Sequence, residues 1–392
     1  MYSARNSVRL YSTRASRSLN TNSTREPPVA EVQAARAYCL SLLRYVVSRS
    51  PTILPKLTPP RTFDSPSYVL QTFIPPSARD AYLAIRAFNI DIARVADSVS
   101  HPTVGAMRMQ FWRDNIDRTL RGSPPKEPVA VLLAHALELL EARGARKLSR
   151  GWFFRVIATR EQYLSNPPYP NLAAMETYAE NTYSTLLYLT LSALPLSSIA
   201  ADHLASHIGK AMGIAAVLRG LPLLAFPPPP NHHNNPSGLG GLPPGGSRQG
   251  VVTLPLDVMA EANVRDEDIL RLRGEAEGLR DAVFAVATRA NDHLITAREM
   301  LRNIQAGRDA GHDFEHQGEE GHEIHEYDDQ AKGVTAVQEV ERGFGVLMPA
   351  VATSLWLERL QGVGFDVFSP QLRKREWRLP WRSYWAFKRK MF

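Results

Sequence analysis

Apolar residues recur with helical spacing along most of the chain, and the clearest example lies at residues 77–120. Six of them follow one another at steps of three or four, the spacing of one buried helical face: Ala81, Ile85, Phe88, Ile92, Val95 and Val99. The charged residues between them, Arg86 included, fall mostly on other faces. After a break at His101 and Pro102, a second helix ending near Gly122 is predicted to carry Met107, Phe111, Trp112 and Ile116. The pattern predicts two packed helices.

The same periodicity predicts helices elsewhere, whereas no segment of any length alternates as a half-buried strand would. The further helices are expected at residues 32–47, 128–142, 149–164, 172–194, 200–218, 266–304 and 338–360. Core candidates in the last two are Leu270, Leu279, Val283, Val286, Leu294, Phe344, Leu347, Val351, Leu355 and Leu360. The chain is therefore expected to be all-α.

Composition divides the chain into one helical domain and several extensions. The domain is expected at residues 67–372, after a helix and a Pro-rich connector at residues 29–66. Two segments inside it, 226–248 and 307–333, are expected to be loop insertions, because the first is rich in Pro, Gly and Asn and the second in His and acids. The second insertion could bind a metal weakly, but its irregular spacing favours a surface loop.

The 392 residues have an ordinary globular composition, with 44% apolar and 22% charged residues. Cys39 is the only cysteine, which excludes a disulfide framework within the chain and a cysteine-based metal cluster. The longest apolar stretches are interrupted, for instance by Pro195 and by Arg219, so the sequence argues against a transmembrane span.

The net charge of +7 is concentrated at the N-terminus. The first 25 residues contain five arginines and no acid, with Ser and Thr between them, which is typical of a mitochondrial transit peptide; we place it at residues 1–28. A disordered basic tail is the alternative. Without these five arginines the chain has 46 − 5 = 41 basic and 39 acidic residues, so its charge gives no reason to expect a nucleic acid partner.

Histidines give little support for a metal site. His203 and His207 are four residues apart on a predicted helix, a geometry that can hold a metal, but no third ligand lies nearby in the sequence. His135 stands alone on an apolar face and is interpreted as a structural histidine. We expect no metal and no cofactor.

The predicted helix 172–194 carries a stripe of polar residues, namely Tyr178, Asn181, Thr182 and Thr185. The stripe either lines a cavity or packs closely against a neighbouring helix, and the pattern does not decide between the two. In the next helix, Gly209 and Gly213 are spaced to permit such a close approach.

The C-terminal tail, residues 373–392, has eight basic residues, one acid and three tryptophans. This mixture suits an anionic membrane surface, where aromatic rings lie at the level of the headgroups. RNA binding through stacking and phosphate contacts, or a helix that simply covers the bundle, are the alternatives. The residues expected to contact a membrane are Trp377, Trp381, Trp385, Arg378, Arg382 and Lys388.

Several segments resemble the squalene/phytoene synthase family. They are RAFN at 86–89, Asp97, FWR at 111–113, GSPPKEPVA at 122–130, YAENTYSTLLYL at 178–189, IGKAMGIAAVLR at 208–219 and TLP at 253–255. The resemblance covers residues 67–300 well and the C-terminal block more loosely. It implies the all-α isoprenoid-synthase fold.

Catalysis in that family requires two acidic clusters that hold Mg²⁺ ions against a diphosphate across an apolar cavity. The resemblance places the first cluster on Ala93, Arg94 and Asp97, and the second on Gly220 and Leu224. Asp97 is the one acid left, and Arg94 introduces a cation. We therefore expect a pseudoenzyme without catalytic or metal-binding residues, with Asp97, Arg94 and Arg219 at the mouth of a vestigial cavity, where ion pairs are the simplest role for them.

Four further segments resemble a non-catalytic branch of the family that acts in the assembly of mitochondrial complex I: DSV at 97–99, RMQFW at 108–112, ADHLASHIGKAMGI at 201–214 and GFDVFSPQL at 364–372. This resemblance implies a peripheral protein at the matrix face of the inner membrane. Its partners would be assembly intermediates of the membrane arm, and its cavity could hold an isoprenoid or lipid-like ligand. The alternatives are a prenyl-diphosphate transferase with a rearranged metal site and an RNA-associated matrix protein.

Overall fold

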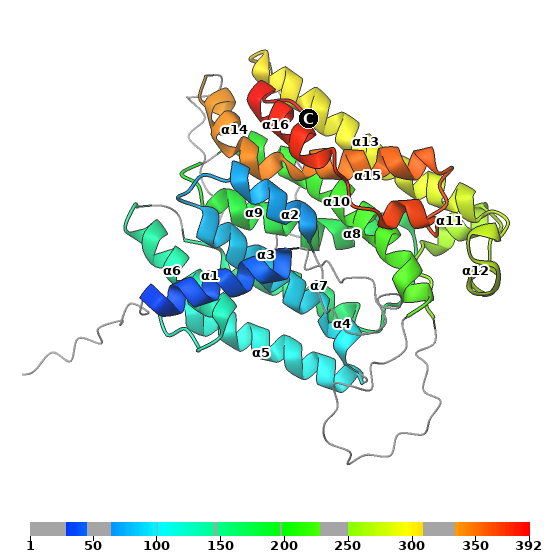
Figure 1. Cartoon of the computed structure of the whole chain (residues 1–392), viewed down its shortest axis with the longest axis horizontal. Helices are drawn as coiled ribbons and strands as arrows, with labels where there is room; N and C mark the ends of the chain where they lie inside the picture. Colours follow the sequence, from blue (N-terminus) through cyan, green and yellow to red (C-terminus); the bar gives the residue numbers. More distant parts are fainter. Residues whose placement is uncertain are drawn as a thin grey trace, which may run out of the picture.

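The computed structural model describes residues 29–44, 64–99, 101–144, 147–196, 198–227, 250–308 and 334–392. In these ranges the protein is a bundle of helices without a strand, which confirms the predicted all-α class (Figure 1). The helices are α1 (Val29–Leu43), α2 (Ser65–Leu70), α3 (Arg79–Ala93), α4 (Val95–Ser98), α5 (Pro102–Leu120), α6 (Pro128–Glu141), α7 (Arg150–Gln162), α8 (Leu172–Ala179), α9 (Thr185–Ser192), α10 (Ile199–Ala225), α11 (Leu256–Glu261), α12 (Asp266–Leu272), α13 (Leu279–Gln305), α14 (Val334–Leu347), α15 (Pro349–Gly362) and α16 (Leu379–Arg389). Short helical turns occur at Gln71–Phe73, Glu180–Ser184, Arg273–Glu275 and Pro370–Arg373.

Several predicted segments lie outside these ranges. They include the proposed transit peptide, most of the Pro-rich connector and nearly all of both proposed insertions. The end of the connector is described, and α2 begins there at Ser65.

The two helices that the sequence predicted first are α3, continued by α4, and α5. All six apolar residues of the predicted face of α3 and α4 are buried, as expected. On α5, Trp112 and Ile116 are buried, but Met107 is 68% exposed and Phe111 is 52% exposed. Helix α5 packs on α6 and α7 with one face. Met109 is buried on that face, whereas Met107 and Phe111 lie outside it.

Helix α10 forms the centre of the bundle. It packs against α8, α9, α13, α14 and α15, and Figure 1 shows it running through the interior. By length and apolar content α10 could cross a membrane, but just over half of its most apolar window is buried inside the protein. Its burial between five other helices identifies it as the core helix of this bundle.

Two glycines let α10 approach the chain between α8 and α9. A Cβ atom added at Gly209 would lie 2.3 Å from the Cα of Ser184, and one at Gly213 would lie 2.4 Å from the Cβ of Ala179. The Ser184 hydroxyl donates a hydrogen bond across this contact to the Ser206 carbonyl at 3.0 Å. The structure thus confirms the close approach that the glycine spacing predicted.

The segment opposite these glycines, Glu180–Ser184, is a π-helical turn. Its Glu180 carboxylate accepts hydrogen bonds from the Tyr188 hydroxyl at 2.6 Å and from the Ser206 hydroxyl at 2.8 Å. A π turn inserts one extra residue into a helix, so the residues after it face a different direction from the one that regular helical spacing predicts.

A second polar contact joins α8, α10 and α13 through histidines. His207 Nδ1 lies 3.0 Å from His293 Nδ1, and His293 Nε2 lies 2.7 Å from Glu176 Oε1. Burial alone would raise the pKa of Glu176, but hydrogen bonds from His293 and Arg289 outweigh it and lower that pKa to about 2. Across the described ranges, no group of three or more His, Cys, Asp or Glu residues is arranged to hold a metal ion.

The close approach of α10 leads to a first prediction. Gly209→Ala should lower the free energy of unfolding by about 1–3 kcal/mol or more, because the added methyl group would clash with the backbone of Ser184 and the two helical segments would have to move apart. Gly220→Ala is the matched control in the same helix, since nothing lies within 4 Å of its added Cβ, and it should stabilise the protein by up to about 1 kcal/mol. Urea denaturation measures both. A Gly209→Ala variant as stable as the parent would contradict the packing described here.

The pKa of Glu176 leads to a second prediction. The folded-state pKa of Glu176, about 2, lies below the ordinary value of 4.5. The ionised carboxylate therefore stabilises the fold fully above pH 4.5, and this stabilisation is lost as the pH falls towards 2. Glu176→Gln should therefore lower the Tm at neutral pH and reduce the loss of Tm on acidification through this window. Glu267→Gln, at an exposed position on α12, is the control. Identical acid dependence in both variants would refute the assignment.

Candidate functional site

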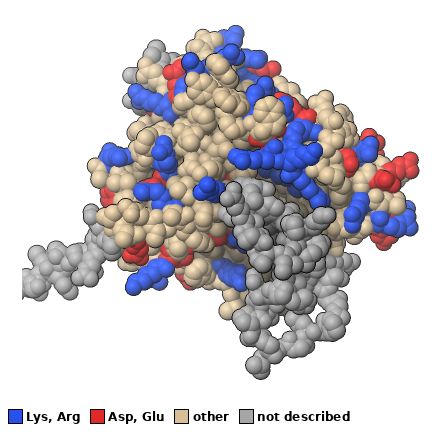
Figure 2. Space-filling view, in the orientation of Figure 1, with Lys and Arg blue, Asp and Glu red and all other residues tan. Residues whose placement is uncertain are grey.

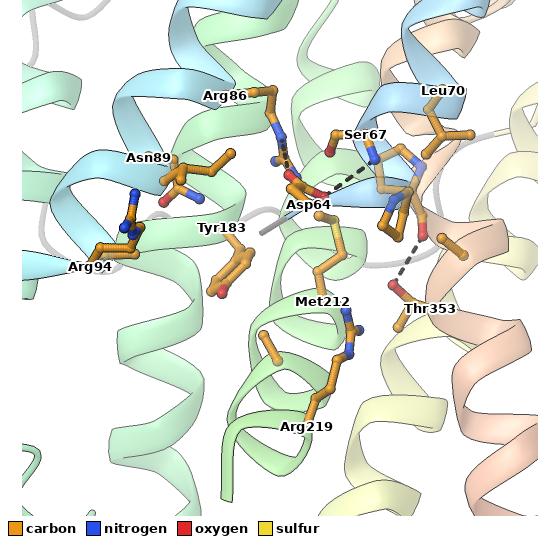
Figure 3. A pocket seen from close by; sticks show the side chains of 16 residues that line it. Asp64, Ser67, Leu70, Arg86, Asn89, Arg94, Tyr183, Met212, Arg219 and Thr353 are labelled. Atoms are coloured by element: carbon orange, nitrogen blue, oxygen red, sulfur yellow. Dashed lines mark hydrogen bonds and ion pairs between the residues drawn. The ribbon is translucent and has the colours of Figure 1, made fainter. Parts of the chain in front are cut away.

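A cavity of about 170 Å³ opens between α2, α3, the π-helical turn, α10 and α15 (Figure 3). Part of its lining is apolar, with Leu70, Ile90 and Met212 among the contributing residues. The polar and charged residues of the lining are Asp64, Ser67, Arg86, Asn89, Arg94, Tyr183, Arg219 and Thr353. Three of these are arginines and one is an acid, so the lining is cationic.

The acid of the cavity is fully engaged. Asp64 caps the start of α2 by accepting a hydrogen bond from the Ser67 backbone at 3.3 Å. Its Oδ2 also accepts from Arg86 Nε at 3.0 Å and Nη2 at 2.5 Å, as the dashed lines in Figure 3 show. Burial lowers the pKa of Arg86, but Asp64 outweighs this and raises it. Both carboxylate oxygens of Asp64 therefore already accept hydrogen bonds, so they are poorly placed to bind a metal ion.

Arg86 corrects one expectation from the sequence. It was placed on a polar face of its helix, yet it is 5% exposed. Because a buried charge is tolerated when it is paired, Asp64 explains how an arginine lies among the core residues of α3. The sequence contains a signal for Asp64, since an aspartate before Ser-Pro is a common helix N-cap, but that signal does not reveal its partner.

The three residues expected at the cavity mouth are only partly brought together. Arg94, at the end of α3, and Arg219, on α10, both line the cavity and lie on different sides of the Asp64–Arg86 pair (Figure 3). Asp97 lies in α4, is exposed, and is not part of the lining. The guanidinium of Arg219 lies 5.3 Å from the centre of the Trp356 ring, and within the described parts of the chain no salt bridge joins it to a carboxylate.

The four residues expected to line a cavity from 172–194 do not contribute to this one; Tyr183 does. The Thr182 hydroxyl donates to the Tyr178 carbonyl at 2.6 Å, and the Thr185 hydroxyl donates to the Glu180 carbonyl at 3.1 Å. Asn181 is half-buried. The π-helical turn changes which residues face the cavity, and a sequence pattern read with regular helical spacing does not detect that change.

A further arginine, the half-buried Arg160, lies beside the cavity. Arg160 donates to the Tyr178 hydroxyl and to Asn89 Oδ1, the latter at 3.2 Å, and Asn89 is itself in the lining. Its guanidinium also lies 5.5 Å from the centre of the Tyr183 ring. Its Nε is buried with no hydrogen-bond partner among the residues that the structure describes. The positive charge therefore extends from the cavity into the surrounding interior.

The positions of the expected metal ligands lack the chemistry for Mg²⁺. Ala93 and Arg94 line the cavity, while Gly220 and Leu224 lie near the end of α10. None of these four side chains supplies a carboxylate, and Mg²⁺ in such sites is held through carboxylates and phosphate oxygens. The cavity is also smaller than the roughly 300–1,000 Å³ of ordinary ligand pockets. Its size and charge fit a small anion rather than a metal-bound prenyl diphosphate.

The predicted membrane-contact residues gather on and beside α16. Trp377, Trp381 and Trp385 are 72%, 67% and 50% exposed, whereas Leu379 and Ser383 of the same segment are buried against the bundle. In the upper part of the molecule, where α16 lies, uncharged side chains are bordered by Lys and Arg (Figure 2). The helix thus covers the bundle with one face and exposes aromatic rings on another.

The charged residues of this predicted set have local partners. Arg378 forms an ion pair with Glu376 at 3.1 Å, and Arg382 forms one with Glu358 at 3.3 Å. The Lys388 ammonium lies 5.8 Å from the centre of the Trp385 ring.

Two solved structures that this fold resembles are a dehydrosqualene synthase and a squalene synthase. A dehydrosqualene synthase in complex with ligand matches with a TM-score of 0.60 and 13% identity, covering 93% of this chain and 99% of that one. The squalene synthase HpnC from Alicyclobacillus acidocaldarius matches with a TM-score of 0.55 and 13% identity, covering 88% and 99%. At this identity the likeness shows the fold, and it confirms the expected isoprenoid-synthase architecture.

Curated relatives are closer in sequence. The protein named "NADH dehydrogenase (ubiquinone) complex I, assembly factor 6" from Bos taurus is 32% identical over 347 residues, which are 88% of this chain and 80% of the relative. The Homo sapiens protein of the same name is 31% identical over the same shares. The Drosophila melanogaster homolog is 29% identical over 82% of this chain and 79% of its own.

The family model for squalene/phytoene synthase matches residues 61–311, which include α2, α3, the π-helical turn and α10 among the elements that line the cavity. This match, together with relatives above 30% identity over most of the chain, confirms the resemblance that the sequence segments suggested. The chain belongs to the squalene/phytoene synthase family.

Proposed function

We propose that this chain acts in the assembly of mitochondrial complex I as a non-catalytic member of its family. The observation that carries the non-catalytic part of the proposal is the cationic lining of the cavity, in which Ala93 and Arg94 stand at two positions that the resemblance assigns to the first acidic cluster. The names of the relatives support the assembly role, since all three are named for complex I assembly.

The physical argument against prenyl transfer is electrostatic. Release of diphosphate needs Mg²⁺ ions that neutralise the leaving group while a carbocation forms. Arg94 and Arg219 would repel such ions, and Asp64 is already occupied by Arg86. The residues that surround the cavity therefore oppose both the metal and the cation of that reaction.

A transferase with a rearranged metal site is the second candidate, and it would need acids from elsewhere. Asp91 is the nearest on α3, but it does not line the cavity. Its pKa is raised to about 6, by burial first and then by Glu127 at the start of α6. Asp91 is thus part of the contact between α3 and α6, which leaves this candidate without a second carboxylate at the site.

For the location, we propose the matrix face of the inner mitochondrial membrane, with peripheral attachment through α16 and the residues before it. The exposed Trp377, Trp381 and Trp385 beside several basic residues support this attachment, because such rings are suited to the headgroup region. The partners proposed are intermediates of the membrane arm. An isoprenoid or lipid-like ligand in the cavity would require the cavity to widen beyond 170 Å³.

The assembly role predicts a selective defect. Cells that lack the gene should lose assembled complex I and NADH:ubiquinone oxidoreductase activity, while the other respiratory enzymes stay intact, because the missing protein serves that one complex. Native gels and enzyme assays on isolated mitochondria measure both. Normal complex I in such cells would refute the proposal.

The non-catalytic role predicts how two variants behave in rescue of that defect. Asp97→Asn should restore complex I fully, because Asp97 is exposed and lies outside the cavity lining. Arg86→Met should fail or rescue weakly, because it removes the ion-pair partner that donates two hydrogen bonds to Asp64, a loss that typically costs about 3–5 kcal/mol. Thermal unfolding of the purified variants checks that difference.

The same variants separate the scaffold from the transferase. Loss of rescue in Asp97→Asn with unchanged stability would favour an enzyme that depends on its remaining acid. Mg²⁺-dependent release of diphosphate from a prenyl diphosphate by the purified parent protein would count directly against the non-catalytic proposal.

A further inference from the structure

A second hollow, of about 250 Å³, lies between α13, α15 and α16. We call it the C-terminal groove and define it by Arg298 of α13, Ser354 of α15, and Arg382, Trp385 and Arg389 of α16. The remaining lining is apolar and includes Met391 and Phe392. The side chains of the lining carry three positive charges and no negative charge.

Arg298 is held in place at this groove. Its Nε donates to the Phe392 oxygen at 2.9 Å, and its Nη2 donates to the Ser354 hydroxyl at 2.9 Å. Among the described residues its Nη1 has no hydrogen-bond partner. Burial lowers the pKa of Arg298; Glu358 opposes that shift, and Arg302 and Arg382 add to it. The guanidinium is therefore fixed at the groove with the Phe392 oxygen as one acceptor, and Arg382 and Arg389 add two further guanidinium groups to the lining.

The other cations of the groove have few carboxylates to pair with. Arg382 shares Glu358 with Arg378, at 3.3 Å and 3.6 Å. The Arg389 guanidinium lies over the Trp385 ring, 5.5 Å from its centre, and no salt bridge joins it to a carboxylate in the described parts of the chain. Planar guanidinium groups of this kind bind phosphate oxygens through paired hydrogen bonds.

The rim of the groove is aromatic and exposed. Trp381 is 67% exposed, Trp385 50%, Tyr384 49% and Met391 45%. Tryptophan and tyrosine favour the boundary between the headgroups and the acyl chains of a membrane, where one side of the ring is apolar and the other is wet. The aromatic rim and the cationic groove therefore meet on one helix.

We propose that the C-terminal groove binds the phosphate of an anionic phospholipid headgroup, while Trp381 and Trp385 enter the interface beside it. This inference rests on the membrane attachment proposed above and adds a defined headgroup site to it. A lipid fits better than RNA, because α16 has 11 residues and spans about 16 Å. The exposed side chains on this helix and directly after it include aromatic rings and the apolar Met391. Single-stranded nucleic acids are bound by longer tracks of stacking rings.

Two matched pairs of substitutions in the full chain test the site. The groove pair, Arg382→Gln with Arg389→Gln, and the control pair, Lys374→Gln with Lys388→Gln, each remove two positive charges from exposed positions of the C-terminal segment. The groove pair alone alters residues of the groove lining. Co-sedimentation is measured with vesicles of phosphatidylcholine, with and without phosphatidylglycerol.

The parent protein should bind the vesicles that contain phosphatidylglycerol and bind those of phosphatidylcholine far more weakly. The control pair should lose up to about 25-fold in binding, from about fivefold for each basic residue near an anionic surface. The groove pair should lose at least about tenfold more, because hydrogen bonds to the phosphate are removed as well.

The outcomes separate the site from the attachment. Equal losses in both pairs would overturn the headgroup site and leave membrane attachment intact. Failure of the parent to bind either kind of vesicle would overturn both. Displacement of the bound protein from vesicles by single-stranded RNA, with tighter binding to RNA than to lipid, would overturn the lipid assignment.

Thermal unfolding of the variants shows whether the groove pair has lost structure. If that pair melts lower than the control pair, the comparison is made between the single variants Arg389→Gln and Lys388→Gln. These neighbouring positions both lie near the Trp385 ring, and the same tenfold difference is expected between them. Equal binding of the two single variants would overturn the site.

Discussion

The packing of α10 against the π-helical turn is the contact on which the rest of the bundle depends. Gly209 and Gly213 bring the backbone of α10 so close to Ser184 and Ala179 that no larger residue fits. The polar groups exposed by the irregular turn are satisfied within the same contact, where Glu180 accepts from Tyr188 and Ser206. Tyr183 of this turn and Arg219 of α10 both line the cavity. The site and the core are therefore fixed by one contact.

The fold of the family is present, whereas most positions that the resemblance assigns to metal-binding acids carry other residues. The packing positions of α3 and α10 carry small and apolar residues. Of the five positions that the resemblance assigns to metal-binding acids, Asp97 alone is an acid, and the other four are Ala93, Arg94, Gly220 and Leu224. The ion pair between the buried Arg86 and the half-buried Asp64 is part of the cavity lining, where it joins the start of α2 to α3.

The sequence predicted the helical class, the buried face of α3 and the glycine contact, because each depends on local spacing. It did not predict that Met107 and Phe111 are exposed, since the narrow contact face of α5 is set by which helices lie beside it. The pairing of Arg86 with Asp64 joins residues 22 positions apart, and no periodic pattern encodes it. Tyr183 was missed for a third reason, the extra residue of the π-helical turn. Local patterns thus gave the elements, whereas the charged and irregular parts of the site depend on tertiary contacts.

Helix α16 is supported by the same two helices that form one side of the cavity. It packs on α2 and α15, and these helices supply Ser67, Leu70, Ala352 and Thr353 to the lining. A ligand in the cavity that changes the distance between α2 and α15 therefore also changes the surface on which α16 packs. Suppose that a ligand in the cavity changes the affinity of the outer face of α16 for its partner by some factor. By thermodynamic linkage, that partner changes the affinity of the cavity for the ligand by the same factor. Binding in the cavity and binding at the outer face of α16 are therefore expected to be coupled.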